Sequence, residues 1–379
     1  MNLAQAEAFD RIRLLRSPNV GPVSYAHLLR RFGSGLAALE ALPDLAVRAG
    51  GGRGGGRYTI APAARIEAEV LAVKRANARY LFHDSPDYPP LLRVAEGAPP
   101  ILIVRGDPAL AARPTVALVG ARNASAAAMK LARMFASELA AKGFVVVSGL
   151  ARGIDGAAHK GALAGAAERG GTIGVIAGGI DVTYPPEHAD LQQQIAGEGL
   201  LLTEQPPGTE PLARHFPARN RIIAGLAIGT VVVEAAPRSG SLITARLAGE
   251  IGREVMAVPG SPLDARSQGC NQLIRDGATL VQSADDVIEA LSDFHGAPSM
   301  RLREPFVAAP DLDDSAEVGL TEVGVADIAS LLTTAPVAVD DLMRLSGATP
   351  GAVQMALLEL ELAGRLARHA GGRVSLDPS

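Results

Sequence analysis

The sequence predicts an α/β protein with a doubly wound, mostly parallel sheet at its centre, a helical domain before it and a winged-helix domain after it. Six short apolar runs in the middle of the chain alternate with segments long enough to form helices. Continuous apolar strands that alternate with helices are typical of a parallel sheet covered on both faces. The runs begin at Val116, Phe144, Thr172, Leu200, Thr230 and Glu254.

Composition limits the classes of protein that fit. The 379 residues suggest two or three domains. The single cysteine, Cys270, excludes a disulfide framework and a cysteine-rich zinc site, and the seven histidines show no metal-binding spacing, so we expect neither a metal nor a cofactor. No apolar run reaches the roughly 18 residues of a membrane span, and charges fill the position of a signal peptide, so we expect a cytoplasmic protein. The predicted parts are a helical domain over residues 1–82, the sheet domain over 83–296, a linker over 297–318 and a winged-helix domain over 319–379.

The first domain reads as short helices. Leu14, Leu15, Leu28 and Leu29 recur at helical spacing, and the stretch 17–22 between them predicts a tight turn. This is the outline of a helix-hairpin-helix, whose turn amides can hold a backbone phosphate, although any helical hairpin with such a turn gives the same pattern. The segment up to residue 82 carries 12 basic and 6 acidic residues, a net charge of +6.

The carboxyl ends of the predicted strands carry the candidate binding residues, because ligands of open α/β sheets bind there. Several of the following loops place glycine and hydroxyl residues at the start of a helix, where free amides favour an anion. One such loop more often just suits the strand-to-helix turn, but several along one edge, with arginines, favour a polynucleotide backbone. The candidates are Gly120, Arg122, Ser125, Ser148, Gly149, Arg152, Lys160, Arg238, Ser239, Gly240 and Ser241.

A further candidate segment is 216–221, with Arg219, Asn220 and Arg221 in the first turn of a helix. Cations are unfavourable at that end of a helix, so the arginines either pair with acids such as Glu234 or face phosphate. No G-x-G-x-x-G fingerprint opens the helix after the first predicted strand, where the turn reads Gly-Ala-Arg-Asn-Ala-Ser, and no P-loop motif is present. Ser148, Asp155 and His159 form a conceivable hydrolytic trio, but we favour a helix-capping aspartate and an interhelical histidine.

The last 60 residues predict three helices and a hairpin, which is the outline of a winged helix. Thr349 and Pro350 mark the start of the third helix, and Gly364 marks its end. A winged helix usually reads DNA with this helix, yet here it has no basic residue, and the segment from residue 297 has 6 basic and 12 acidic residues. We therefore expect the tail to bind protein, and its proline-rich acidic tether predicts that it is separable from the core.

Six ordered motifs together resemble the bacterial DNA-processing protein A family (DprA, also called Smf). The resemblance implies a Rossmann-like central domain, a SAM-like helical head and no catalytic activity. It also implies a homodimer that binds single-stranded DNA, protects incoming DNA in natural transformation and loads the RecA recombinase. The motifs are Val119-Gly-Ala-Arg122, the stretch 148–155 with Ala158-His159, Tyr184-Pro185, the stretch 216–221, the stretch 234–244 and Val258-Pro-Gly260.

The resemblance also assigns residues. Arg122 matches an arginine of the family's basic pocket, and Asn271, Ile274 and Leu280 match its dimerisation region. Family members often carry a lysine near the Tyr-Pro motif, where this chain has Pro186-Glu187-His188, and Lys160, Arg214 or Arg219 are candidates to replace it. The alternative function is a Rossmann-like enzyme that cleaves nucleotide monophosphates, but its P-G-G-x-G-T-x-x-E motif is absent.

Overall fold

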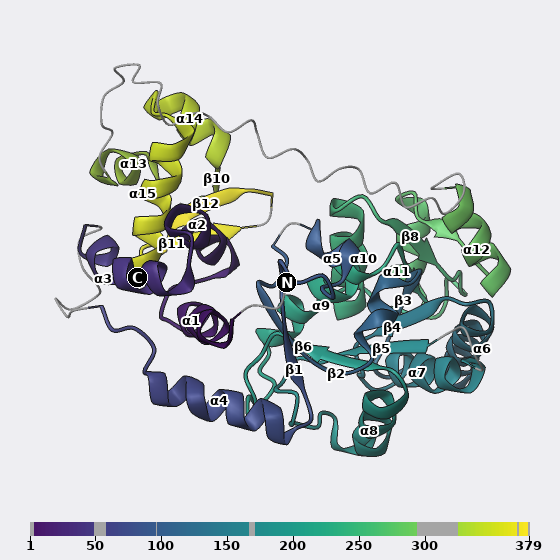
Figure 1. The fold of residues 1–379 in the computed structure, drawn as a ribbon. Coiled ribbons are helices and arrows are strands. Elements are labelled where there is room, and N and C mark those ends of the chain that lie inside the picture. Colours follow the sequence, from purple (N-terminus) through teal and green to yellow (C-terminus); the bar gives the residue numbers. More distant parts are fainter. Residues whose placement is uncertain are drawn as a thin grey trace. The chain divides into compact units, whose positions relative to one another are not determined.

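The computed structural model describes residues 4–48, 58–95, 97–166, 171–293, 325–369 and 371–377, so the predicted linker at 297–318 lies outside the described residues. The chain divides into two compact units (Figure 1). One unit contains the sheet and covers Glu69–Leu302, and the other combines Met1–Ala68 with Arg303–Ser379. Among the described residues, no helix combines the length and the apolar character that crossing a membrane requires.

The sheet has nine strands in the order β1-β2-β6-β5-β4-β3-β7-β8-β9. The seven strands from β6 to β9 in this order run parallel, and β2 and β1 are added antiparallel at one edge. This confirms the predicted mostly parallel sheet. The strands are β1 (Arg79–Phe82), β2 (Ile101–Gly106), β3 (Thr115–Val119), β4 (Val145–Ser148), β5 (Gly171–Val175), β6 (Leu200–Thr203), β7 (Gly229–Val232), β8 (Glu254–Ala257) and β9 (Thr279–Leu280).

Alternate residues of the strands face opposite sides, so the uninterrupted apolar runs fill two cores. Val116 and Leu118 of β3 join one buried cluster, whereas Ala117 and Val119 join the other. Helices cover both faces, as a doubly wound fold requires (Figure 1). The first face carries α6 (Ala126–Ala141), α7 (Ile154–Gly165) and α12 (Ala284–Asp293), and the second carries α5 (Pro90–Arg93), α9 (His215–Leu226), α10 (Gly240–Glu250) and α11 (Gln268–Arg275).

The antiparallel edge was not among the predicted strands. The run Ile101–Val104 is buried and pairs with both β1 and β6. The strand was missed because Pro99 and Pro100 come directly before it, and these prolines predicted an extended connection between two domains. Since β1 belongs to the sheet, the sheet begins at Arg79, a few residues before the predicted boundary at residue 82.

The helix α11 buries the only cysteine of the chain. The Cys270 Sγ donates to the carbonyl oxygen of Val232 at 3.5 Å, and the residue has no exposed surface. Burial raises the pKa of this thiol to about 12.

The sheet winds in two directions from β3, which places the site. The chain continues from β3 to β4, β5 and β6 on one side, and returns to β7, β8 and β9 on the other. Loops that leave such a switch point diverge and open a crevice at the carboxyl ends of the strands. Glu234, which follows β7, links the two loops nearest this point. Its carbonyl oxygen accepts from the Ala121 amide at 2.6 Å, and its Oε2 accepts from the Ser125 amide at 2.8 Å.

The second unit holds the helices of the chain's first part and the winged helix of its last part. The side chain of Thr349 accepts from the Ala352 amide, and Gly364 adopts φ +70° just past the third helix, so both predicted ends of that helix are confirmed. The elements are α1 (Gln5–Leu15), α2 (Pro22–Phe32), α3 (Gly35–Arg48), α13 (Val325–Leu331), β10 (Val337–Ala338), α14 (Val339–Ser346), α15 (Pro350–Leu362), β11 (Leu366–His369) and β12 (Arg373–Leu376). The described residues also form the helices α4 (Ala63–Arg75) and α8 (Ala189–Glu198) and the short turns η1 (Pro108–Ala112) and η2 (Pro186–His188).

The winged helix lies outside the unit that contains the sheet, but it packs on the N-terminal helices, a contact that the expectation of a separable tail did not include. Leu358 and Leu362 of α15 lie in one buried cluster with Leu14 and Leu28 of the first helices. The acidic tether suggested independence, but α15 is apolar on more than one face and buries the second face against the N-terminal helices.

Candidate nucleic-acid interface

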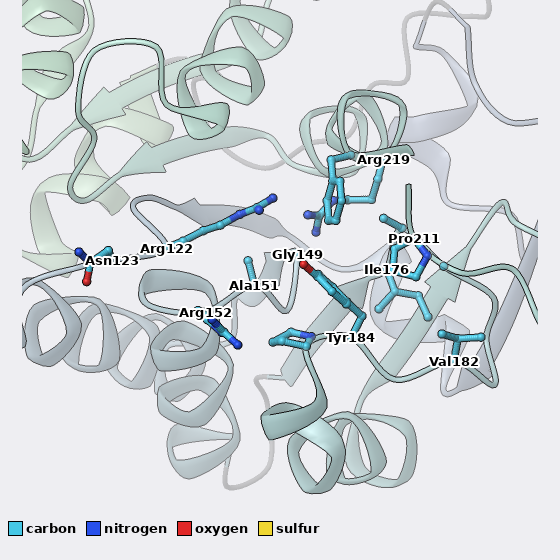
Figure 2. A pocket seen from close by; sticks show the side chains of 14 residues that line it. Arg122, Asn123, Gly149, Ala151, Arg152, Ile176, Val182, Tyr184, Pro211 and Arg219 are labelled. Atoms are coloured by element: carbon cyan, nitrogen blue, oxygen red, sulfur yellow. The ribbon is translucent and has the colours of Figure 1, made fainter. Parts of the chain in front are cut away.

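A cavity of about 360 Å³ lies at the carboxyl ends of β3, β4 and β5. The loop after each of these strands supplies part of its wall, and α9 closes it from one side (Figure 2). We call this cavity the strand-end pocket. It is lined by Arg122, Asn123, Gly149, Ala151, Arg152, Ile176, Ala177, Gly178, Val182, Tyr184, Pro185, Pro211, Phe216 and Arg219.

An aromatic pair flanked by arginines forms one wall of the pocket. The ring of Phe216 lies 5.8 Å from the ring of Tyr184, centroid to centroid, at an interplanar angle of 57°. The Arg122 guanidinium lies 4.8 Å from the Phe216 centroid, and the Arg219 guanidinium lies 6.0 Å from it. Figure 2 shows the Arg122 side chain reaching across the pocket toward Arg219. Aromatic faces beside cations suit a nucleotide, because bases stack on the rings while the cations attract phosphate.

The two arginines differ in their freedom. Arg122 is exposed, whereas Arg219 is only 5% exposed and donates from Nη1 to the carbonyl oxygen of Val175 at 2.9 Å. Arg219 also lies against Gly149, where a Cβ atom would be 1.6 Å from its Nη1. Burial lowers the pKa of Arg219 to about 10, which leaves the side chain charged at neutral pH. Arg122 is therefore free to bind a ligand, and Arg219 builds the floor.

Asp155 holds the loop after β4 in place. Its Oδ2 accepts from the Gly149 amide at 3.2 Å and from the Ala151 amide at 3.4 Å. Burial raises the pKa of this carboxyl, while Arg219 and the two amides act in the opposite direction. The aspartate thus fixes the backbone that forms the pocket floor, where Leu150 adopts φ +57°.

The residues of the conceivable hydrolytic trio are engaged inside the protein. Ser148 is fully buried, and its hydroxyl donates to the carbonyl oxygen of Leu118 at 2.6 Å. The hydroxyl of Thr172 donates to Val146, so it accepts from Nδ1 of His159, 2.7 Å away. Burial, with His188 and Arg219 nearby, lowers the pKa of His159 to about 3. A neutral, buried histidine and a committed serine favour a packing role for these residues.

An exposed ion pair lies at the edge of the pocket. Arg152 is 63% exposed and Glu187 is 45% exposed, and Nε of Arg152 contacts Oε1 of Glu187. The hydrogen bond between them raises the pKa of Arg152 and lowers the pKa of Glu187. Glu187 lies in the segment where the resemblance led us to expect a lysine, so the pocket edge carries a carboxylate and a partly neutralised arginine.

Not all predicted residues come together in the pocket. Arg221 pairs with Glu204 rather than with Glu234, and its Nη1 donates to the Gly97 carbonyl oxygen at 2.7 Å. Asn220 is largely buried and donates to the carbonyl oxygen of Gly240 at 3.2 Å. The structure therefore gives both residues structural contacts outside the pocket lining.

The remaining predicted residues lie outside the strand-end pocket. Ser125 caps α6 by accepting from the Ala128 amide at 3.1 Å, and Ser239 is the N-cap of α10 and accepts from the Ser241 amide. Gly120 packs closely, since a Cβ there would meet Ile154 at 2.6 Å. Lys160 and Arg238 are exposed and lie outside the lining of the strand-end pocket. The four predicted residues that the structure brings into the pocket are Arg122, Gly149, Arg152 and Arg219.

Tyr184 and Phe216 were missing from the predicted site. Both stand in motifs that the sequence analysis singled out, Tyr184-Pro185 and Phe216-Pro-Ala-Arg219. The sequence did contain a signal for them: the chain has only 13 aromatic residues, and these two stand in motifs that also carry the candidate arginines or follow a strand end. Their meeting depends on the fold, because 32 positions separate them in the sequence.

The predicted dimer residues lie at the far edge of the sheet. Asn271 binds both the amide and the carbonyl oxygen of Gly260, at 3.1 and 2.9 Å. Ile274 is partly buried against the sheet core, and Leu280 on the edge strand β9 is 46% exposed.

Three family models match the chain. The model described as DNA recombination-mediator protein A matches residues 79–292. The model of a DprA-like N-terminal HHH domain matches residues 5–72, and that of a DprA winged helix domain matches residues 324–372.

Known proteins with similar sequences carry related names. Protein Smf of Escherichia coli is 38% identical over 322 residues, which cover 84% of this chain and 83% of that protein. The DNA processing protein DprA of Streptococcus pneumoniae is 48% identical over 202 residues, which cover 53% of this chain and 70% of that protein.

Solved structures of two such proteins resemble this one. The crystal structure of the S. pneumoniae protein covers 76% of this chain and 98% of its own, with 38% identity and a TM-score of 0.65. The DNA processing protein A of Helicobacter pylori, whose structure is described as showing a unique single-stranded DNA binding mode, covers 57% of this chain and 96% of its own, with 28% identity and a TM-score of 0.51.

The buried histidine predicts how stability depends on pH. Because the pKa of His159 falls from 6.5 to about 3 on folding, its stabilising contribution is complete above pH 6.5 and is lost as the pH falls toward 3. At pH about 5 the loss amounts to about 2 kcal/mol. Urea unfolding should show that the free energy of unfolding falls less between pH about 7.5 and about 5 in His159→Asn than in the wild type. Equal drops in the two proteins would contradict this role.

Proposed function

The chain belongs to the DNA recombination-mediator protein A family, and from this premise we propose that it binds single-stranded DNA in the strand-end pocket. The observation that carries the proposal is the wall of Phe216 and Tyr184 with the exposed Arg122 beside it. The single-stranded DNA binding mode described for the H. pylori protein supports the same ligand.

The chemistry of the pocket suits a nucleotide of a flexible strand. Stacking of a base on an aromatic ring contributes about 1–3 kcal/mol and tolerates any sequence, because every base has a flat face. A cavity of about 360 Å³ is within the size of small-molecule sites. In this proposal Arg122 and Arg152 contact phosphates and the two aromatic rings stack with bases. Gly149 and Arg219 shape the floor, and the exposed Lys160 and Arg238 lie along the outer path of the strand.

The wider role proposed here follows the family. The protein protects incoming single strands in natural transformation and loads the RecA recombinase onto them in the cytoplasm. It acts as a homodimer through α11 and β9, and it binds DNA without turning it over. A recombinase loader must hold a single strand without reading its sequence, and stacking with phosphate contacts does this. The proposed domains keep the predicted linker at 297–318, with the sheet domain extended to include β1.

Removing the exposed arginine should weaken DNA binding. We expect Arg122→Ala to cost about 1–3 kcal/mol in affinity for oligo-dT. The salt dependence should flatten by about 0.7 in log–log slope, because one phosphate contact is lost. Fluorescence anisotropy at two salt concentrations measures both effects.

The matched control for this variant is Arg246→Ala, which removes an exposed arginine of α10 that pairs with Glu250 outside the pocket. Unchanged affinity and slope in Arg122→Ala would rule out the proposed contact. Turnover of nucleoside monophosphates by the wild type would instead support the enzyme alternative.

The carboxylate at the pocket edge should oppose DNA binding. Glu187 occupies Arg152 and repels phosphate, so Glu187→Gln should raise the affinity for oligo-dT about two- to fivefold, the modest effect expected for an exposed ion pair. The control is Glu198→Gln at the exposed end of α8. An equal gain in both variants would assign the effect to net charge alone.

The exposed leucine of the edge strand should mark the dimer contact. A charge in a two-fold contact is buried twice, so Leu280→Glu should convert a dimer into a monomer. Leu280 is 46% exposed in one chain, so the substitution should leave the fold intact. Light scattering gives the mass, and a monomeric wild type at micromolar concentration would remove the proposal.

A further inference from the structure

The third helix of the winged helix, α15, is buried on two faces. Val353, Leu357 and Leu360 recur at helical spacing and pack in the core of the winged helix itself. Met355, Leu358 and Leu362 recur at the same spacing on another face and pack with the N-terminal helices. A single-faced helix would suffice for the winged helix alone, so the second face serves another contact.

The surface that receives this second face is made by the first helices. Leu14, Val20, Tyr25 and Leu28 lie in the shared cluster with residues of α3, and α15 contacts both α2 and α3. Leu358 and Leu362 are each 1% exposed. Burial this complete removes both apolar side chains from water, which stabilises the contact.

Polar contacts fix the register at the end of α15. The Nδ2 of Asn19, in the turn between α1 and α2, donates to the carbonyl oxygen of Leu362 at 2.9 Å. This carbonyl belongs to the last turn of the helix, whose carbonyl oxygens lack partners within the helix. Glu361 lies close to the turn between α1 and α2, because its Oε1 is 3.4 Å from the position of a Cβ on Gly21. Its Oε2 accepts from Nε of Arg368 at 2.8 Å.

We propose that the N-terminal helical domain is a helix-binding module and that α15 of the same chain is its resident ligand. The module recognises apolar residues at positions i, i+3 and i+7 of an amphipathic helix, and Asn19 recognises the helix end. This is the helix-in-groove mode of recognition. The contact occupies the helix with which a winged helix usually enters the major groove, and it covers the turn between α1 and α2. The proposal is independent of the strand-end pocket.

The test measures hydrogen exchange in the full chain. Leu358→Asp places a charge in the interface, and we expect the protection of residues 14–28 to fall at least tenfold while α13 and α14 keep theirs. The matched control is Leu345→Asp, because Leu345 lies in the same domain but is 68% exposed. Unchanged protection of residues 14–28 in Leu358→Asp would overturn the proposal.

A second variant decides the case in which Leu358→Asp unfolds the winged helix. Asn19 adopts φ +58°, which glycine tolerates, so Asn19→Gly removes the hydrogen bond without straining the turn. We expect a two- to tenfold loss of protection over residues 14–28, the effect of about one hydrogen bond. No change in Asn19→Gly would overturn the proposal.

Light scattering of the uncut chains distinguishes a contact within one chain from an exchange between copies. Equal masses of wild type and Leu358→Asp support docking within one chain. A lower mass in the variant would show that α15 docks on a second copy, which overturns the assignment of the resident ligand.

Discussion

The pocket depends on one buried cation. The guanidinium of Arg219 connects α9 to the end of β5 through Val175 and lies against Gly149 after β4. A buried charge is costly unless hydrogen bonds and an opposite charge surround it, and Asp155 supplies that charge while it holds the loop amides. The buried Arg219 thus connects three segments that lie far apart in the sequence: α9, the end of β5 and the loop after β4.

The same anchoring orients the aromatic wall. Phe216 precedes Arg219 by three residues on α9, so the two side chains share a face of the helix. Fixing Arg219 in the floor therefore fixes Phe216 at the rim, where Arg122 and Tyr184 contact it. Buried contacts thus position the floor and the aromatic rim, whereas the exposed Arg122 remains available to contact a ligand.

The sequence predicted the parts of the fold that local patterns determine. Uninterrupted apolar runs predicted β3 to β8, and Thr349 and Gly364 predicted the ends of α15. Partner choice could not be predicted, because a charge pattern does not say which acid lies within reach. Arg221 therefore turned out to pair with Glu204, and Arg152 with Glu187. The second apolar face of α15 was readable, but its use depends on contacts across more than 300 residues.

The burial of Cys270 has a practical consequence. The thiolate is the reactive form of cysteine, and a thiol with a pKa near 12 and no exposed surface forms almost none of it at neutral pH. Since this is the only cysteine of the chain, the protein offers no internal partner for a disulfide, and its thiol should resist alkylation and oxidation. A cysteine introduced on the surface would thus be the single reactive thiol, so one dye can be attached at one chosen place in an otherwise unmodified protein.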